Sequence, residues 1–197
     1  GAATVLAQQP QAQLLSSLEP DHPLQALRPS QRCEAGQQWE WDGVTFTVLH
    51  PLPADYGVAR TPNALSCVLR ISNGIATALL TGDIEKQQEE RLVTDAGSTG
   101  AAGNLKADIL LVPHHGSKTS SSPEFLDAVA PALAVVQSGY RNRFAHPSAL
   151  VMERYRERHI AVLDSPHCGA LIWRSERATE TVCQREVARR VWHHRIP

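Results

Sequence analysis

The sequence predicts an α+β fold, and three successive patterns along its 197 residues indicate it. Two hairpin turn signals, Asp42-Gly43 and Asn73-Gly74, separate short apolar segments, which is typical of antiparallel strands. Strands and helices then alternate, and a pair of strands closes the chain. A chain of this length is enough for one domain and short for two, so we expect a single domain over residues 1–197.

The first half of the chain is expected to be a run of antiparallel strands. Residues 2–18 carry a weak helical pattern that Pro10 interrupts, and residues 19–32 read as a loop with three prolines. Strands are expected at 39–41, 44–49, 65–71 and 75–80, because these segments are apolar and bounded by turn residues.

In the second half, a charged segment at 84–95 predicts an exposed helix, and Ser122-Pro123 predicts a helix start with serine as its N-cap. A further helix is expected at 148–158 and strands at 108–113, 132–136, 160–163, 170–173 and 180–187. The runs at 76–80 and 108–113 are so apolar that we expect both faces of these strands to be covered.

Composition excludes several classes of protein. The chain is 42% hydrophobic and 20% charged with a net charge of −1, as in soluble globular proteins, and a broad attraction for nucleic acid is not evident. It has no apolar stretch of transmembrane length and no signal-peptide pattern. Its four cysteines show no Cys-x-x-Cys spacing, so a cysteine zinc site is not expected. Cys168 and Cys183 could bridge across a hairpin or be buried free thiols.

The most informative motifs follow two of the predicted strands. Thr81-Gly82-Asp83 ends one apolar run, and His114-His115-Gly116-Ser117 ends the next. Strand ends are where α/β proteins place their chemistry, and a carboxylate with imidazoles is a ligand set for a divalent metal. The sequence therefore predicts a metal site at these strand ends.

Together with their flanks, these motifs resemble the metallo-β-lactamase-like domain of ComEC-type DNA internalisation (competence) proteins. The resemblance covers more than half of the chain, from about Asn63 to Trp173. The segments that carry it are Asn63-Ala64-Leu65-Ser66, residues 79–83, residues 107–117, residues 138–147, Leu163-Asp164-Ser165 and residues 169–172.

The resemblance implies a sandwich of two mixed sheets flanked by helices, with a metal centre at one edge. The family's chief ligand motif, of the type His-x-Asp-x-Asp-His followed by Gly-Gly, is absent, so we expect the sequence to begin just after it and to lack the first strands. Such a piece should bind metal weakly or not at all, and its uncovered sheet edge favours dimerisation. A diverged ligand set with His22 or His50 is disfavoured, because neither has an acidic neighbour at ligand spacing.

The resemblance also assigns roles at the two motifs. Asp83 matches a metal-bridging, catalytic carboxylate; the alternative is an N-cap for the helix that follows. We favour His114 as a metal ligand and give His115 a catalytic role in orienting that ligand or contacting phosphate. Both could instead be loop histidines bonded to the backbone.

Further substrate contacts are expected in the following loops. Ser117, Ser120 and Asn142 are candidates for binding phosphate, although both serines could equally cap turns. His146 could bind or protonate a phosphodiester leaving group, or cap the helix that begins near Ser148. Lys118 and Arg141 are possible phosphate contacts, but such charges are more often simply solvated.

The activity implied by the resemblance is metal-assisted hydrolysis of DNA with two manganese or zinc ions, in an intact domain. The partners implied are DNA, single-stranded or being degraded, and the membrane-channel portion of the parent protein. That parent would lie in the bacterial inner membrane with this domain periplasmic or extracellular. The alternatives are another hydrolase of the superfamily, such as a phosphorylcholine esterase, or a DNA-binding module without catalysis.

Overall fold

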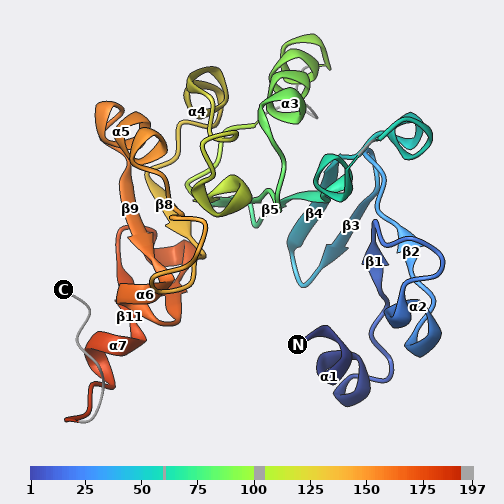
Figure 1. The fold of residues 1–197 in the computed structure, drawn as a ribbon, viewed down its shortest axis with the longest axis horizontal. Coiled ribbons are helices and arrows are strands. Elements are labelled where there is room, and N and C mark those ends of the chain that lie inside the picture. The colour runs from blue at the N-terminus through green and yellow to red at the C-terminus, as the bar shows by residue number, and fades with distance from the viewer. Residues whose placement is uncertain (60, 100–104, 192–197) are drawn as a thin grey trace.

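A computed structural model of the chain describes residues 1–59, 61–99 and 105–191. Its centre is one mixed sheet of seven strands in the order β3-β4-β5-β6-β7-β8-β9 (Figure 1). The strands are β3 (Gln38–Trp41), β4 (Val44–His50), β5 (Val68–Ser72), β6 (Thr77–Leu80), β7 (Ile109–Leu111), β8 (Leu133–Val136) and β9 (Ala161–Asp164). Neighbours from β3 to β6 are antiparallel and neighbours from β6 to β9 are parallel.

The two predicted hairpin turns join the antiparallel strands. Asp42 and Gly43 both have positive φ, 50° and 75°, which is the backbone of the tight turn that Asp-Gly favours. At the second turn, Asn73 Oδ1 accepts hydrogen bonds from the backbone N–H groups of Ile75 and Ala76, at 3.1 and 3.0 Å. Local turn chemistry therefore sets the antiparallel half of the sheet.

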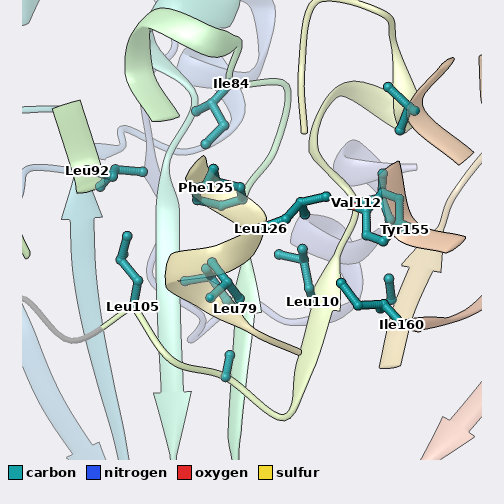
Figure 2. Close-up of a cluster of buried hydrophobic side chains, with 14 of the residues drawn as sticks. Leu79, Ile84, Leu92, Leu105, Leu110, Val112, Phe125, Leu126, Tyr155 and Ile160 are labelled. Carbon is teal, nitrogen blue, oxygen red and sulfur yellow. The ribbon is translucent and has the colours of Figure 1, made fainter. Parts of the chain in front are cut away.

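Three helices connect the parallel strands and lie on one side of the sheet, along the top of Figure 1. They are α3 (Lys86–Thr99), α4 (Pro123–Val129) and α5 (Ala149–Glu157). Leu79 and Leu110 of the sheet pack against Phe125, Leu126 and Tyr155 of the helices, and all five are fully buried (Figure 2). Burying side chains of this size contributes about 1.5–3 kcal/mol each, so this layer is the main core.

The opposite face of the sheet is less covered than we expected. On β6 and β7 the residues of the helix side are buried, whereas Leu80, Ile109 and Leu111 are only half-buried. They line a cavity of about 490 Å³ together with β10 (Leu171–Trp173). The expectation that both faces are covered was therefore wrong, because β10 pairs only with β11 (Thr181–Cys183) and this two-stranded sheet is too small to cover that face.

The remaining elements are short. In the N-terminal part, β1 (Leu15–Ser16) pairs in parallel with β2 (Gln31–Arg32), a contact that the sequence did not predict. The other elements are α1 (Ala2–Gln8), α2 (Pro23–Leu27), α6 (Ser165–Cys168), α7 (Gln184–Val187) and the 3₁₀ turns η1 (Pro53–Gly57), η2 (Pro62–Leu65), η4 (Pro113–Gly116) and η5 (Ser175–Arg177). The strand expected at 180–187 thus ends at Cys183, where α7 begins.

Strand β3 forms one edge of the large sheet. All four of its residues are exposed, so the edge is accessible, and dimerisation through an exposed edge stays a prediction. Within the described ranges, no helix is long and apolar enough to cross a membrane.

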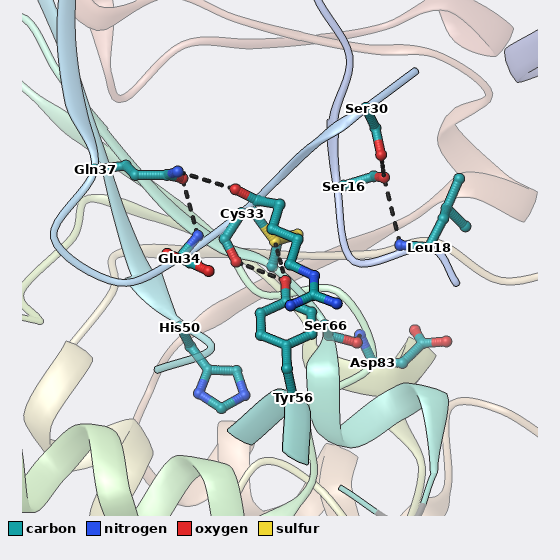
Figure 3. The surroundings of a disulfide bond; sticks show 12 residues. Ser16, Leu18, Ser30, Cys33, Glu34, Gln37, His50, Tyr56, Ser66 and Asp83 are labelled. Atoms are coloured by element: carbon teal, nitrogen blue, oxygen red, sulfur yellow. Dashed lines mark hydrogen bonds between the residues drawn. A yellow bond between two sulfur atoms is a disulfide. The ribbon is translucent and has the colours of Figure 1, made fainter. Parts of the chain in front are cut away.

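All four cysteines form disulfides. Cys168 pairs with Cys183, as one of the two sequence alternatives had it, and Cys33 pairs with Cys67, which we did not predict. Beside the second bridge, the Tyr56 hydroxyl donates to the Cys33 carbonyl at 2.7 Å (Figure 3). Cys67 follows Ser66, whose hydroxyl contacts Asp83, so this disulfide anchors a segment next to the predicted site.

Candidate metal and catalytic site

The two predicted site motifs lie side by side. Strands β6 and β7 are parallel neighbours, so the loops after them leave the same edge of the sheet. Thr81 Oγ1 donates to the Leu111 carbonyl at 2.8 Å, and the His114 N–H donates to the Gly82 carbonyl at 3.0 Å. These bonds bring Asp83 into the same cluster as the histidine pair.

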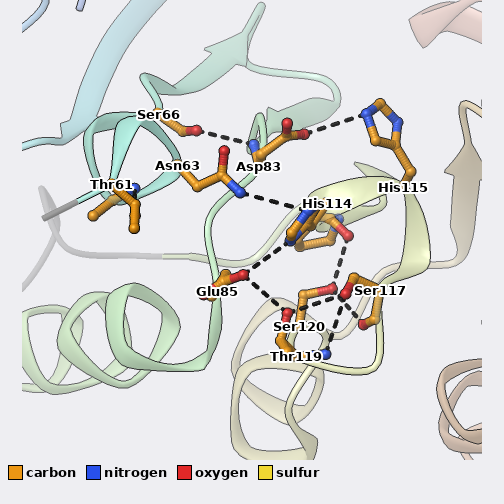
Figure 4. Close-up of polar contacts among 12 residues, drawn as sticks. Thr61, Asn63, Ser66, Asp83, Glu85, His114, His115, Ser117, Thr119 and Ser120 are labelled. Carbon is orange, nitrogen blue, oxygen red and sulfur yellow. Dashed lines mark hydrogen bonds and ion pairs between the residues drawn. The ribbon is translucent and has the colours of Figure 1, made fainter. Parts of the chain in front are cut away.

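Asp83 and His115 face each other across the two loops (Figure 4). Asp83 Oδ1 lies 3.5 Å from His115 Nε2, and the two side chains are 39% and 49% exposed, so an ion from solvent can reach them. His115 Nδ1 lies 2.5 Å from the carbonyl oxygen of Gln137. A carbonyl can only accept, so Nδ1 carries a proton, and Nε2 is the nitrogen that could give a lone pair to a metal ion.

His114 points elsewhere, toward Asn63 and Glu85 (Figure 4). His114 Nε2 lies 3.5 Å from Asn63 Nδ2, and Nδ1 lies 3.2 Å from Glu85 Oε1. Nδ1 is buried and, despite that short distance, is not aligned for a hydrogen bond with the carboxylate. Asp83 therefore faces His115 and Glu85 faces His114, and His114 as a metal ligand stays a prediction.

Backbone conformation explains why the adjacent imidazoles diverge. His114 and His115 have left-handed φ values of 49° and 55° inside the turn η4, so the strand has already ended. Alternation along an extended strand therefore does not govern them. Left-handed backbone is rare for residues other than glycine, and such strain occurs often at functional sites.

His146 joins this cluster from the loop after β8. Its ring centroid lies 6.0 Å from that of His114 and 5.8 Å from that of Phe144. Burial lowers the pKa of His146, nearby positive charge on His114 and His115 lowers it further, and Asp83 partly opposes this. His146 Nδ1 is buried without a hydrogen-bond partner, so a neutral ring offers a lone pair or a proton here.

Gly116 allows the two loops to approach. Its φ is +80°, and a Cβ on it would lie 2.6 Å from Pro147 Cβ, which is a clash. The Gly116 carbonyl also accepts the Ser148 N–H at 2.9 Å. A side chain at position 116 would push the His146 loop away from the His114 loop.

The three predicted phosphate-binding side chains are engaged within their own loops. Ser117 Oγ lies 3.0 Å from Thr119 Oγ1, and Ser120 Oγ donates to the Pro113 carbonyl at 2.8 Å; both serines are buried. Asn142 Nδ2 donates to the His146 carbonyl at 2.6 Å, and Asn142 Oδ1 accepts the His146 N–H at 3.0 Å. They shape the site's loops, and contact with substrate stays a prediction for all three.

The alternative N-cap roles can be compared directly. Helix α3 begins at Lys86, so Glu85 and not Asp83 precedes it, and the Asp83 carboxylate faces His115 instead. Helix α5 is capped by Ser148, whose hydroxyl accepts the Val151 N–H at 3.3 Å. Neither Asp83 nor His146 therefore has the capping role that we weighed for it.

The donor set fits part of a metal shell. The Asp83 carboxylate and the His115 Nε2 lone pair are borderline-to-hard donors of the kind that manganese and zinc take, and His115 has the carbonyl partner that orients metal-binding imidazoles. Within the ranges that the structure covers, however, no group of three or more such residues could hold an ion. A full coordination shell needs donors besides these two.

Sequence reasoning missed Glu85 and gave Asn63 no role of its own. Glu85 Oε1 lies near His114 Nδ1 and also accepts a hydrogen bond from Thr119 Oγ1 at 3.1 Å. In the sequence, Glu85 stands out only by lying two residues after Asp83. Acidic residues are common near helix starts, so this position alone does not indicate a functional residue.

Several curated proteins resemble the chain, and three of them are described here, while no family model matches it. Competence protein ComA of Neisseria gonorrhoeae is 44% identical over 137 residues, 70% of this chain and 19% of that protein. Recombination protein 2 of Haemophilus influenzae is 35% identical over 169 residues, 86% of this chain and 20% of that protein. ComE operon protein 3 of Bacillus subtilis is 34% identical over 129 residues, which are 66% of this chain and 16% of that protein. The chain thus spans about a fifth of the length of these relatives.

Solved structures support the fold. CmlA β-hydroxylase, as its E377D mutant, superposes with a TM-score of 0.52 at 13% identity over 81% of this chain and 39% of that one. The metallo-β-lactamase fold protein YhfI of Bacillus subtilis covers 80% of this chain and 64% of its own at 12% identity, but its TM-score of 0.41 is too low to support an argument. The α+β, metallo-β-lactamase-like fold class that the sequence predicts is confirmed. Among the described residues the structure has one large mixed sheet where the prediction had two, because the other two sheets have only two strands each. The chain accordingly has homologues among competence proteins and shares its fold with the solved CmlA β-hydroxylase.

Proposed function

We propose that this chain belongs to a metal-dependent phosphodiester hydrolase, the nuclease domain of a ComEC-type DNA-uptake protein that acts in natural competence. Two of the relatives are named for competence and a third for recombination, which supports a role with DNA. In this proposal the chain supplies one side of the active site, and the other metal ligands come from residues outside it.

One observation carries the proposal: the facing pair of Asp83 and His115. A carboxylate and an imidazole nitrogen 3.5 Å apart, each reachable from solvent, are groups that a divalent ion could bind in place of their mutual contact. The Gln137 carbonyl holds a proton on Nδ1 and so leaves Nε2 as the nitrogen for the ion.

The remaining residues have roles around that pair. Manganese or zinc ions, when bound, would activate water and offset charge on the phosphate oxygens. In this proposal His146 protonates the leaving alkoxide; the lowered pKa makes its imidazolium a stronger acid but a less populated one near neutral pH. Glu85 and Asn63 hold His114 in the wall of the site.

The disulfides support a proposal for the cellular setting. Two disulfides in one domain are typical of oxidising compartments, such as the periplasm or cell surface. We therefore propose that the parent protein lies in the bacterial inner membrane, with this domain on the outer side of that membrane.

The test is hydrolysis of labelled single-stranded DNA by a protein extended to the length of the relatives, with Mn²⁺, Zn²⁺ or EDTA. We expect cleavage that EDTA abolishes and that Asp83→Asn and His115→Asn each lower by about a hundredfold or more. Glu90→Gln, an exposed neighbour in α3, is the matched control and should retain activity.

Two outcomes would overturn the proposal. Rapid hydrolysis of choline phosphoesters with none of DNA would indicate a different hydrolase of the same fold. DNA binding without any metal-dependent cleavage, unaffected by Asp83→Asn, would indicate a binding module.

A further inference from the structure

A second recess lies beside the candidate site. A cavity of about 580 Å³ is bordered by the start of α3, the loop at 117–123, the turn η1 and helix α5. It shares Glu85 and Thr119 with the candidate site, and these two side chains are hydrogen-bonded at 3.1 Å. A substrate strand that leaves the candidate site past Glu85 and Thr119 would therefore enter the cavity.

The cavity lining carries an excess of positive charge. Among the described residues, four cationic side chains and two carboxylates line it: Lys86, Arg91, Lys118 and Arg154 against Asp55 and Glu85. Arg91 and Asp55 form an ion pair and cancel each other. The net lining is thus positive, although the whole chain has a net charge of −1.

Arg154 forms no carboxylate ion pair within 4 Å among the described residues, although its charge acts on the buried carboxylate of Glu89. Its Nη1 donates to the carbonyl oxygens of Ser120 and Ser121, at 2.9 and 3.0 Å. Carbonyl groups orient a guanidinium without neutralising it, so the remaining N–H groups stay available for an anion.

Lys118 and Lys86 supply charge at the mouth of the cavity. Both are exposed, and Lys86 pairs only across a solvated 3.6 Å contact with Glu90, which is weak. Lys118 lies two residues before Ser120, whose carbonyl holds Arg154. A guanidinium group such as that of Arg154, together with lysine ammonium groups, typically binds a phosphate group.

We propose that this cavity is a phosphate-binding subsite for single-stranded nucleic acid, in which Lys118, Arg154 and Lys86 hold a backbone phosphate next to the one being cleaved. The inference rests on the proposed function and extends it by naming where the strand runs. It assigns the cations a binding role in the ground state, separate from the metal ligands.

The test measures binding of a fluorescent single-stranded oligonucleotide to the 197-residue chain in EDTA, over a series of salt concentrations. One phosphate contact contributes about 0.7 to the slope of log affinity against log salt, which is about fivefold in affinity at 0.1 M salt. We expect Lys118→Ala to lower affinity by about that factor and to reduce the slope by about 0.7, and Lys86→Ala to add to it.

Arg156→Ala is the matched control, because Arg156 is a 74% exposed cation of α5 that does not line the cavity. It removes the same charge and should change affinity by less than about twofold with an unchanged slope. Equal effects of Lys118→Ala and Arg156→Ala would overturn the subsite, because only general charge would then matter. A second titration with inorganic phosphate tests whether the cavity binds a free anion instead of a nucleic-acid phosphate. The inference is wrong if Lys118→Ala weakens phosphate binding but leaves oligonucleotide binding unchanged.

Failure here and failure of the proposed function can be told apart. Asp83→Ala should not weaken this metal-free binding, because it removes a negative charge near the strand, whereas it should abolish cleavage in the longer protein. In that longer protein Lys118→Ala should raise KM and leave kcat unchanged, and a fall in kcat alone would contradict a ground-state subsite.

Discussion

At the scale of single residues, the site depends on hydrogen bonds that fix titratable groups in one state. His115 shows this in the candidate site, where a carbonyl sets its tautomer. His50, which is 2% exposed, shows it in the protein interior, with Nε2 2.9 Å from the Ala64 carbonyl and Nδ1 3.8 Å from Asp55. In each ring, the nitrogen that faces a backbone carbonyl carries a proton.

We predict that His50 makes stability depend on pH. Burial lowers the pKa of His50 below its usual value, with the Ala64 carbonyl and Asp55 opposing this and Arg91 adding to it. The unfolded chain therefore binds more protons as pH falls below about 6.5, so the native state loses stability from there downward. Urea unfolding at pH 7.5 and 5.5 checks this: wild type should lose more stability than His50→Gln, which keeps an amide donor near Ala64.

The comparison of wild type with variant isolates this effect. Burial raises the pKa of Glu89, so its contribution to the free energy of unfolding has the opposite pH dependence. Glu89 is present in both wild type and His50→Gln, so its contribution cancels in the comparison. Equal losses in wild type and His50→Gln would show that His50 does not titrate between the two pH values.

At the scale of elements, loops are held together by contacts that only certain residues allow. The Ser121 and Ser122 N–H groups before α4 donate to Glu89 of α3, at 2.6 and 2.8 Å. We had expected the Ser122 side chain to cap this helix, but it makes no capping bond, and the buried carboxylate from another helix accepts instead. The helix start was thus predicted correctly and its capping partner wrongly.

We predict that Glu89→Gln destabilises the protein by about 2 kcal/mol, because a side-chain amide offers one acceptor where two N–H groups need one each. Exposed Glu90→Gln in the same helix should change stability by less than about 0.5 kcal/mol. Thermal or urea unfolding measures both, and equal effects of the two substitutions would rule out the Glu89 contacts as a support for the loop.

The close approach of the His114 and His146 loops makes a second prediction at this scale. Gly116→Ala places a Cβ at a positive φ and into Pro147, whereas Gly74→Ala has a similar φ of +79° and nothing within 4 Å. Gly74→Ala should cost about 1 kcal/mol from backbone strain and Gly116→Ala about 2 kcal/mol or more. If unfolding experiments give equal losses, the two loops are not in tight contact.

The sequence predicted those elements whose signals are local. Asp42-Gly43, Asn73-Gly74 and the Ser148 cap act over a few residues, so the hairpins and helix starts could be read directly. The facing of Asp83 with His115 could not, because it depends on left-handed backbone that the loop packing imposes. The Cys33–Cys67 bridge and the β1–β2 pair join distant segments, for which a single sequence carries no pairing signal.

At the scale of the whole molecule, the disulfides tie the outer segments to the sheet. Cys33–Cys67 closes a loop of 34 residues and links the N-terminal segment to the start of β5, whereas Cys168–Cys183 closes a loop of 15 residues near the C-terminal hairpin. The larger loop restricts the unfolded chain more, so it should contribute more stability.

We predict that Cys33→Ser with Cys67→Ser lowers the free energy of unfolding by about 4 kcal/mol, and Cys168→Ser with Cys183→Ser by about 3 kcal/mol. Only the first pair should also disturb Asp83, because Ser66 Oγ accepts the Asp83 N–H beside Cys67. Denaturant unfolding gives the energies, and amide exchange at Asp83 reports the local effect; greater exchange there in the second variant would contradict this assignment.

Metal titration of the protein extended to the length of its relatives most directly tests whether Asp83 and His115 form one side of a metal centre. Calorimetry with Mn²⁺ or Zn²⁺ should give two ions per chain, with affinity lowered at least about tenfold by Asp83→Ala and by His115→Ala, and weak or no binding to the 197-residue chain. Wild-type affinity and stoichiometry in both variants would contradict the account, as would tight binding to the 197-residue chain that neither substitution weakens.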